Sequence, residues 1–105
     1  MREYYKRLER INADFAENRE MYFSIIREIA EKYGGRAYLF GSQLKGNAIA
    51  ASDVDVLVVI PNEVHWLDVL VELKEKVRNP KFQFHVRNVK EAEVIMRLIG
   101  QSREL

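Results

Sequence analysis

The sequence predicts an α/β (α+β) fold in which a small mixed β-sheet is flanked by helices, in a single domain over residues 1–105. Three observations lead to this prediction. The first third of the chain repeats its apolar residues every three or four positions, as an amphipathic helix does. Three short apolar runs then alternate with stretches of helical periodicity. A chain of 105 residues, 48% hydrophobic and 31% charged, is long enough for one modest core but not for two.

Residues 2–33 are predicted to be helical, with a break near Asn18 and Arg19, where the apolar stripe is interrupted. An unbroken helix of this length would measure about 48 Å, whereas a domain of this size is about 30 Å across. Residues 1–17 are therefore predicted to be an N-terminal helical extension. Two arrangements stay open, a helix folded back on its own domain or one projecting to a partner. The apolar stripe favours a partner, which includes a second copy of the chain.

The next segment is predicted to contain a strand, a tight turn and a loop. Gly34-Gly35 ends the helix, because glycine tolerates the left-handed cap conformation. Residues 36–40 form a short apolar strand. Gly41-Ser42 then opens a short helical piece that includes Leu44, and residues 46–52 form a loop of small residues.

Two more strands and two more helices complete the predicted fold. Pro61 ends the second strand, which is apolar on both faces and therefore predicted to be central. Asn62 is the predicted N-cap of the next helix. Asn88 and Glu91 resemble a capping box, and Gly100 closes the last helix. The predicted bounds are 53–60 and 82–86 for the strands, and 63–77 and 88–99 for the helices.

Two aspartates mark a candidate metal site where the second strand begins. Asp53 and Asp55 are two residues apart, so on a strand their carboxylates point to the same face. Two negative charges at such a short separation are unfavourable unless a cation lies between them. Carboxylate oxygens are ligands that suit magnesium. Upstream, the Gly41-Ser42 turn offers backbone amides and a hydroxyl to phosphate oxygens. The alternative is a pair of exposed aspartates at the edge of a loop.

Gly41-Ser42, ten further residues and then Asp53-Val54-Asp55 resemble the signature of the DNA polymerase beta-type nucleotidyltransferase superfamily. The resemblance spans residues 18–100, and the small size is similar to its minimal, prokaryotic (MNT/antitoxin-like) branch. It implies a nucleotidyltransferase-like fold and the magnesium-dependent transfer of a nucleoside monophosphate from a nucleoside triphosphate, with ATP as the expected donor. It further implies that Asp53 and Asp55 are catalytic ligands of two magnesium ions. Gly41, Ser42 and Lys45 would bind the nucleotide phosphates, although Lys45 could equally be a solvated lysine.

One departure from the family concerns its third catalytic carboxylate, which lies on the strand after the intervening helix. Residues 82–86 contain no acidic residue, and His85 is the polar side chain best placed to stand in. A neutral imidazole can accept a proton from an attacking hydroxyl or ligate a metal. The alternative is a histidine that is hydrogen-bonded at the edge of the sheet and takes no part in chemistry.

Two functional hypotheses follow. In the first, the protein is a nucleotidyltransferase acting on an acceptor hydroxyl, which the resemblance places on a small helical HEPN-type partner protein. In the second, it is a catalytically weakened module that binds nucleotide or a partner, as an antitoxin does, without transferring anything. The missing carboxylate favours the second hypothesis, and the intact Gly-Ser and Asp-x-Asp motifs favour the first.

The composition narrows the remaining choices. The chain has no cysteine, which excludes disulfides and thiolate metal sites. No apolar run is long enough to span a bilayer, so we expect a cytoplasmic location and no membrane partner. The net charge of +1 does not favour nucleic acid. Residues 72–90 carry a local excess of positive charge, which is typical of a solvated helix face; nucleic-acid binding there is the less favoured hypothesis.

Overall fold

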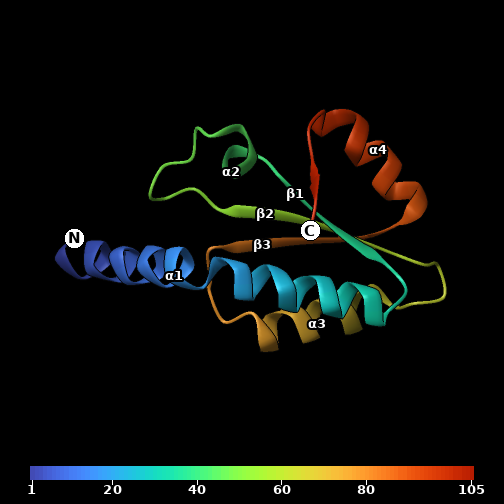
Figure 1. Ribbon diagram of the computed structural model, residues 1–105, viewed down its shortest axis with the longest axis horizontal. Helices are drawn as coiled ribbons and strands as arrows, with labels where there is room; N and C mark the ends of the chain where they lie inside the picture. Colours follow the sequence, from blue (N-terminus) through green and yellow to red (C-terminus); the bar gives the residue numbers. More distant parts are fainter.

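The structure is a computed structural model that describes all 105 residues (Figure 1). Helices and strands follow one another as α1 (Arg2–Lys32), β1 (Arg36–Phe40), α2 (Ser42–Lys45), β2 (Val54–Ile60), α3 (Trp66–Lys76), β3 (Phe82–Asn88), α4 (Val89–Ile99) and β4 (Arg103–Glu104). No helix combines the length and the apolar character needed to cross a membrane.

The four strands form one mixed sheet in the order β3-β2-β1-β4. β1 pairs antiparallel with both β2 and β4, whereas β2 and β3 run parallel and are joined through α3. The predicted fold class is therefore confirmed. β2 lies inside the sheet, as its apolar sequence predicted.

The main core lies between the sheet and the pair of helices α1 and α3, which cover one face of it (Figure 1). Alternate residues of β2 point into this core, and none is more than 2% exposed; they are Val54, Val56, Val58 and Ile60. The opposite face carries Asp55, Leu57 and Val59, because side chains alternate along a strand. Leu57 is fully buried but lies outside the main core cluster, on the face where α4 contacts β2 and β3.

α1 is a single helix, without the predicted break. The amide of Asn18 donates to the backbone oxygen of Asp14 (3.2 Å) and to its carboxylate (2.9 Å), so the polar interruption is satisfied within the helix. Tyr22 also donates to the Asp14 carboxylate. Phe15 is buried in the core. The part of the extension that stands clear of the domain is thus shorter than residues 1–17.

Three local features differ from the prediction. α3 begins at Trp66, because residues 62–64 form a turn after Pro61; His65 rather than Asn62 is its N-cap, and His65 Nδ1 accepts a hydrogen bond from the amide of Leu67 (3.2 Å). β3 continues to Asn88. After the last helix, where no strand was predicted, Arg103 and Glu104 form β4 and pair with β1. The predicted capping box of Asn88 and Glu91 is confirmed.

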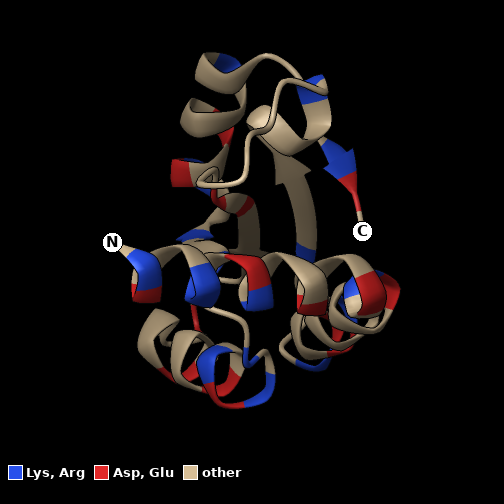
Figure 2. Ribbon diagram, turned by 90° about the vertical axis from the view of Figure 1, so that its left-hand side faces the viewer, with Lys and Arg blue, Asp and Glu red and all other residues tan.

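Basic and acidic residues are interspersed over α1 and α3 (Figure 2). Two of the basic residues in the 72–90 stretch are already engaged: Lys76 pairs with Glu72, and Lys81 is buried. The basic residues of the 72–90 stretch therefore do not form one continuous surface of unpaired positive charge.

Candidate active site

The Gly-Ser and Asp-x-Asp motifs meet where β1 ends and β2 begins. The antiparallel register places Phe40 opposite Asp55, so that Gly41, the next residue, lies beside the Asp55 carboxylate. Gly41 has φ +80°, and a Cβ built on it would lie 2.6 Å from Asp55 Oδ2. A side chain at position 41 would displace the Asp55 carboxylate from the position that it occupies here.

Asp55 lies on the face of the sheet away from α1 and α3, because its neighbours Val54 and Val56 fill the core on the other face. Its side chain is 29% exposed, so it is held by the fold and still open to a ligand. Asp53 lies one residue before β2 and is exposed. The two aspartates thus occupy the mouth of β2, one within the strand and one at the end of the preceding loop.

His85 reaches the same site from β3. Its Nε2 lies 3.4 Å from Asp55 Oδ1, and both side chains are 29% exposed. The imidazole also packs beside the ring of Phe40, with the ring centroids 5.3 Å apart. His85 therefore points from β3 toward Asp55, a predicted metal ligand. β3 is longer than predicted, yet its added residues Arg87 and Asn88 supply no acid either.

Ser42 and Lys45 belong to α2, a single turn that begins directly after Gly41. The backbone amides of Leu44 and Lys45 both donate to the Gly41 carbonyl at 3.2 Å, which fixes the turn. Ser42 is half-buried, and Lys45 is exposed with no ion pair. The structure thus places Ser42 at the first position of this turn and Lys45 at its last.

Lys81 is a residue at this site that was not predicted from the sequence. It is 7% exposed, and its Nζ donates to Asn12 Oδ1 (2.6 Å) and to the Ala50 carbonyl (3.2 Å). Burial lowers the pKa of Lys81, and the charge of Asp53 opposes that shift. A lysine immediately before a buried parallel strand was the available signal, but its contact with residue 50 depends on the tertiary fold.

The residues present fit a magnesium ion that is shared with a bound nucleotide. No three His, Cys, Asp or Glu side chains come together as a self-sufficient metal site. Magnesium is commonly held by one or two carboxylates and completes its shell with phosphate oxygens and water. Asp55, packed against a turn that a Cβ would fill, and Asp53, in the loop before it, are suitable carboxylate donors for that arrangement.

A family described as "Nucleotidyltransferase domain" matches residues 23–101. A solved structure named "putative nucleotidyltransferase" is similar with a TM-score of 0.62 and 29% identity, over 76% of this chain and 92% of the other. A second solved structure, a "putative nucleotidyltransferase from Sulfolobus solfataricus", has a TM-score of 0.53 and 20% identity, over 85% of this chain and 83% of the other. At this identity the likeness supports the fold alone. The comparison with curated proteins finds no match.

The family match includes both motifs, the whole sheet except β4, and the strand that carries His85. It agrees with the fold and with the resemblance of the Gly-Ser and Asp-x-Asp motifs. The chain belongs to the nucleotidyltransferase domain family.

Proposed function

We propose that the protein is a magnesium-dependent nucleotidyltransferase that moves a nucleoside monophosphate from a nucleoside triphosphate, ATP first among the candidates, to an acceptor hydroxyl. The observation that carries this proposal is the packing of Gly41 against Asp55, with His85 facing the same carboxylate. Three groups thereby meet where β1 ends and β2 begins. They are a turn whose backbone can approach phosphate, the Asp55 carboxylate and the His85 imidazole.

In the proposed reaction, the acceptor oxygen attacks the α-phosphorus. The bond from that phosphorus to the bridging oxygen breaks, and pyrophosphate leaves. Asp53 and Asp55 would hold magnesium, which when bound neutralises charge on the phosphates. Gly41 and Ser42, with Lys45, would hold the triphosphate. His85 would take the proton of the acceptor hydroxyl, for which its position beside Asp55 suits it.

The acceptor is proposed to lie on a HEPN-type partner protein that meets the N-terminal extension, in an antitoxin-like pairing and a cytoplasmic setting. The supporting observation is that Tyr4 and Tyr5, near the free end of α1, are 56% and 53% exposed. Exposed aromatic side chains are common at protein interfaces. A second copy of the chain would be the other occupant of the same surface.

A second candidate function is favoured by one specific observation, the absence of any acidic residue on β3. If the imidazole cannot replace the third carboxylate, the site would bind nucleotide without transferring it. The protein would then act as a nucleotide-binding or partner-binding module.

The test is incubation of the purified protein with magnesium and labelled ATP, with and without the protein encoded beside it. Wild type is compared with Asp53→Asn/Asp55→Asn and with Asp68→Asn, a matched control that removes an exposed carboxylate from α3. We expect label transfer in wild type and in the control, and none in the double variant.

The other outcomes separate the hypotheses. Magnesium-dependent ATP binding without transfer, lost in the double variant, would support the binding module. A protein that neither binds ATP nor transfers label would contradict the transferase and the nucleotide-binding module, and one that also fails to bind the protein encoded beside it would contradict the partner-binding module.

A further inference from the structure

The loop that carries Asp53 is attached to the rest of the domain at very few points. Residues 47–51 are exposed, and Ile49 and Ser52 bond to each other across the loop. The hydrogen bonds that reach residues 48–53 from other elements both end on the Ala50 carbonyl. One comes from Asn12 of α1 (3.0 Å) and the other from Lys81 (3.2 Å).

Asn12, Lys81 and the Ala50 carbonyl form a closed set of contacts, which we call the Lys81 clasp. Lys81 Nζ donates to Asn12 Oδ1 at 2.6 Å, while the Asn12 amide donates to the Ala50 carbonyl and also to the Leu8 carbonyl of its own helix. The buried ammonium thus has two oxygen partners. Removing either partner would leave a buried charge poorly satisfied, which is costly.

Lys81 holds the chain on both sides of Asp53. Its side chain binds the Ala50 carbonyl, and its own carbonyl accepts a hydrogen bond from the amide of Val54 (2.8 Å), the residue directly after Asp53. Only residues 51–53 lie between the two points. The position of Asp53 is therefore restricted from both sides by Lys81, the residue directly before β3.

Lys81 is in turn fixed against α1. Its amide donates to Asn79 Oδ1 (2.8 Å), and the Asn79 side chain donates to the Ile11 carbonyl (3.0 Å) and to Asp14 Oδ2 (2.8 Å). Both routes from Lys81 lead to residues 11–14 of α1. These residues lie outside the range that the nucleotidyltransferase family matches.

We propose that Lys81 and Asn12 are positioning residues, which hold Asp53 at the mouth of β2 by clasping the 48–53 loop to α1. The effect of these residues on magnesium dependence rests on the proposed function. Their effect on the mobility of the 48–53 loop does not. Residues 8–14 of α1 then belong to the support of the active site.

The first experiment measures hydrogen–deuterium exchange without nucleotide, so it does not depend on any activity. Lys81→Met keeps an unbranched side chain, one atom shorter, and removes the ammonium donors, and Lys74→Met is the matched control at an exposed lysine of α3. We expect several-fold faster exchange over residues 48–53 in Lys81→Met, with the centre of β2 unchanged. Exchange over the loop equal to that of wild type would overturn the proposal. Asn12→Ala, with the same expectation, serves if Lys81→Met does not fold.

The second experiment titrates magnesium in the transfer reaction. Loss of a residue that orients a metal ligand weakens metal affinity by about 10- to 100-fold. We expect Lys81→Met and Asn12→Ala to raise the magnesium concentration for half-maximal rate by about tenfold, with the KM for ATP at saturating magnesium unchanged. A purely structural role would lower stability and leave the magnesium dependence as in wild type, which would overturn the proposal. If wild type transfers nothing, the proposed function fails, and the exchange experiment still decides the clasp.

Discussion

Residue 41 has to be glycine for two independent reasons. Its φ of +80° and ψ of −155° lie in a region that is essentially restricted to glycine and costs another residue about 1–3 kcal/mol. A Cβ there would also lie 2.6 Å from Asp55 Oδ2 and push the carboxylate away. The first reason concerns stability alone, and the second concerns the site.

Gly41→Ala is therefore expected to abolish transfer as well as lower stability. Gly100→Ala is the matched control, because Gly100 has a φ of +75° and no atom within 4 Å of the Cβ position. We expect both variants to lose about 1–3 kcal/mol of unfolding free energy in urea titrations, because both glycines have a backbone conformation that alanine rarely adopts, and only Gly41→Ala to lose activity. Full activity in Gly41→Ala would show that the packing of Asp55 against the turn is dispensable.

His85 is the residue on which the choice between enzyme and binding module depends. Removing a general base lowers kcat by a factor on the order of 10²–10⁴. We expect His85→Asn to lower kcat to that extent while the affinity for ATP, measured by calorimetry, stays within about twofold. An unchanged kcat would mean that the imidazole only packs against Asp55 and Phe40.

Single residues of the site were predictable from the sequence to different degrees. Gly41, Asp53 and Asp55 could be chosen because their spacing is local and their chemistry specific. The orientation of His85 required the parallel register of β2 and β3, which pairs His85 with Leu57. The role of Lys81 could not be predicted, since its partners lie 69 and 31 positions away in the chain.

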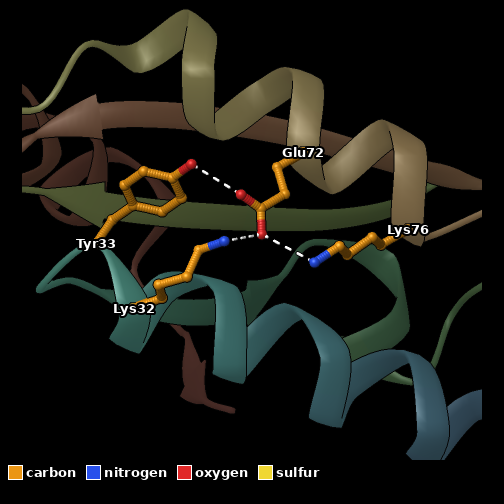
Figure 3. Close-up of polar contacts among 4 residues, drawn as sticks. All are labelled: Lys32, Tyr33, Glu72 and Lys76. Atoms are coloured by element: carbon orange, nitrogen blue, oxygen red, sulfur yellow. Dashed lines mark hydrogen bonds and ion pairs between the residues drawn. The ribbon is translucent and has the colours of Figure 1, made fainter.

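At the scale of elements, α1 and α3 are joined at one end by the carboxylate of Glu72 (Figure 3). Glu72 accepts hydrogen bonds from Lys32, from the hydroxyl of Tyr33 (2.8 Å) and from Lys76 (3.2 Å). These contacts, that of Lys32 foremost, lower its pKa from 4.5 to about 2. Its side chain is 14% exposed, whereas those of the two lysines are more than half exposed and so partly screened by water.

Because the folded-state pKa of Glu72 lies below its unfolded value, its contribution to stability is complete above pH 4.5 and is lost as the pH falls toward 2. At pH 7, Glu72→Gln should be less stable than wild type by about 1 kcal/mol, a figure reduced for solvent screening. The difference should vanish near pH 2. Urea unfolding across this pH range measures it, with Glu75→Gln, an exposed acid on the same helix, as control. A pH-independent difference would contradict the ionic origin of the effect.

The elements themselves were mostly predictable because their signals are local. Periodicity located the helices and strands, and Asn88 with Glu91 marked the start of α4. The predicted N-cap of α3, Asn62, was wrong because it falls in the turn after Pro61. The observed N-cap, His65, is another polar residue only three positions further on. β4 was missed because its two polar residues are a strand only by pairing with Tyr38 and Leu39.

At the scale of the whole molecule, α1 is both a free end and part of the core. Residues 1–7 are exposed, whereas Phe15 is buried and Asp14 accepts a hydrogen bond from Asn79 in the loop before β3. The sequence indicated that an unbroken helix would be longer than the domain, but not which of its residues are anchored. Whether residues 1–17 form an interface stays a prediction.

Two truncations test this division. Deleting residues 2–7 should change the free energy of unfolding by less than about 1 kcal/mol. Deleting residues 2–17 should destabilise by more than about 4 kcal/mol, since the loss of a buried phenylalanine alone costs about 3–5 kcal/mol. Thermal or urea unfolding of both forms is the measurement. A stable 2–17 deletion would show that the first half of α1 is not anchored as the contacts indicate.

The most direct test of the nucleotidyl transfer itself is a paired labelling experiment. The protein and its acceptor candidate are incubated with magnesium and with ATP labelled either at the α- or at the γ-phosphate. Transfer of a nucleoside monophosphate predicts that only the α-label becomes attached to the acceptor and that the γ-label leaves as pyrophosphate, with both signals absent in Asp53→Asn/Asp55→Asn. Attachment of the γ-label, or attachment of the α-label that survives the double substitution, would contradict the account.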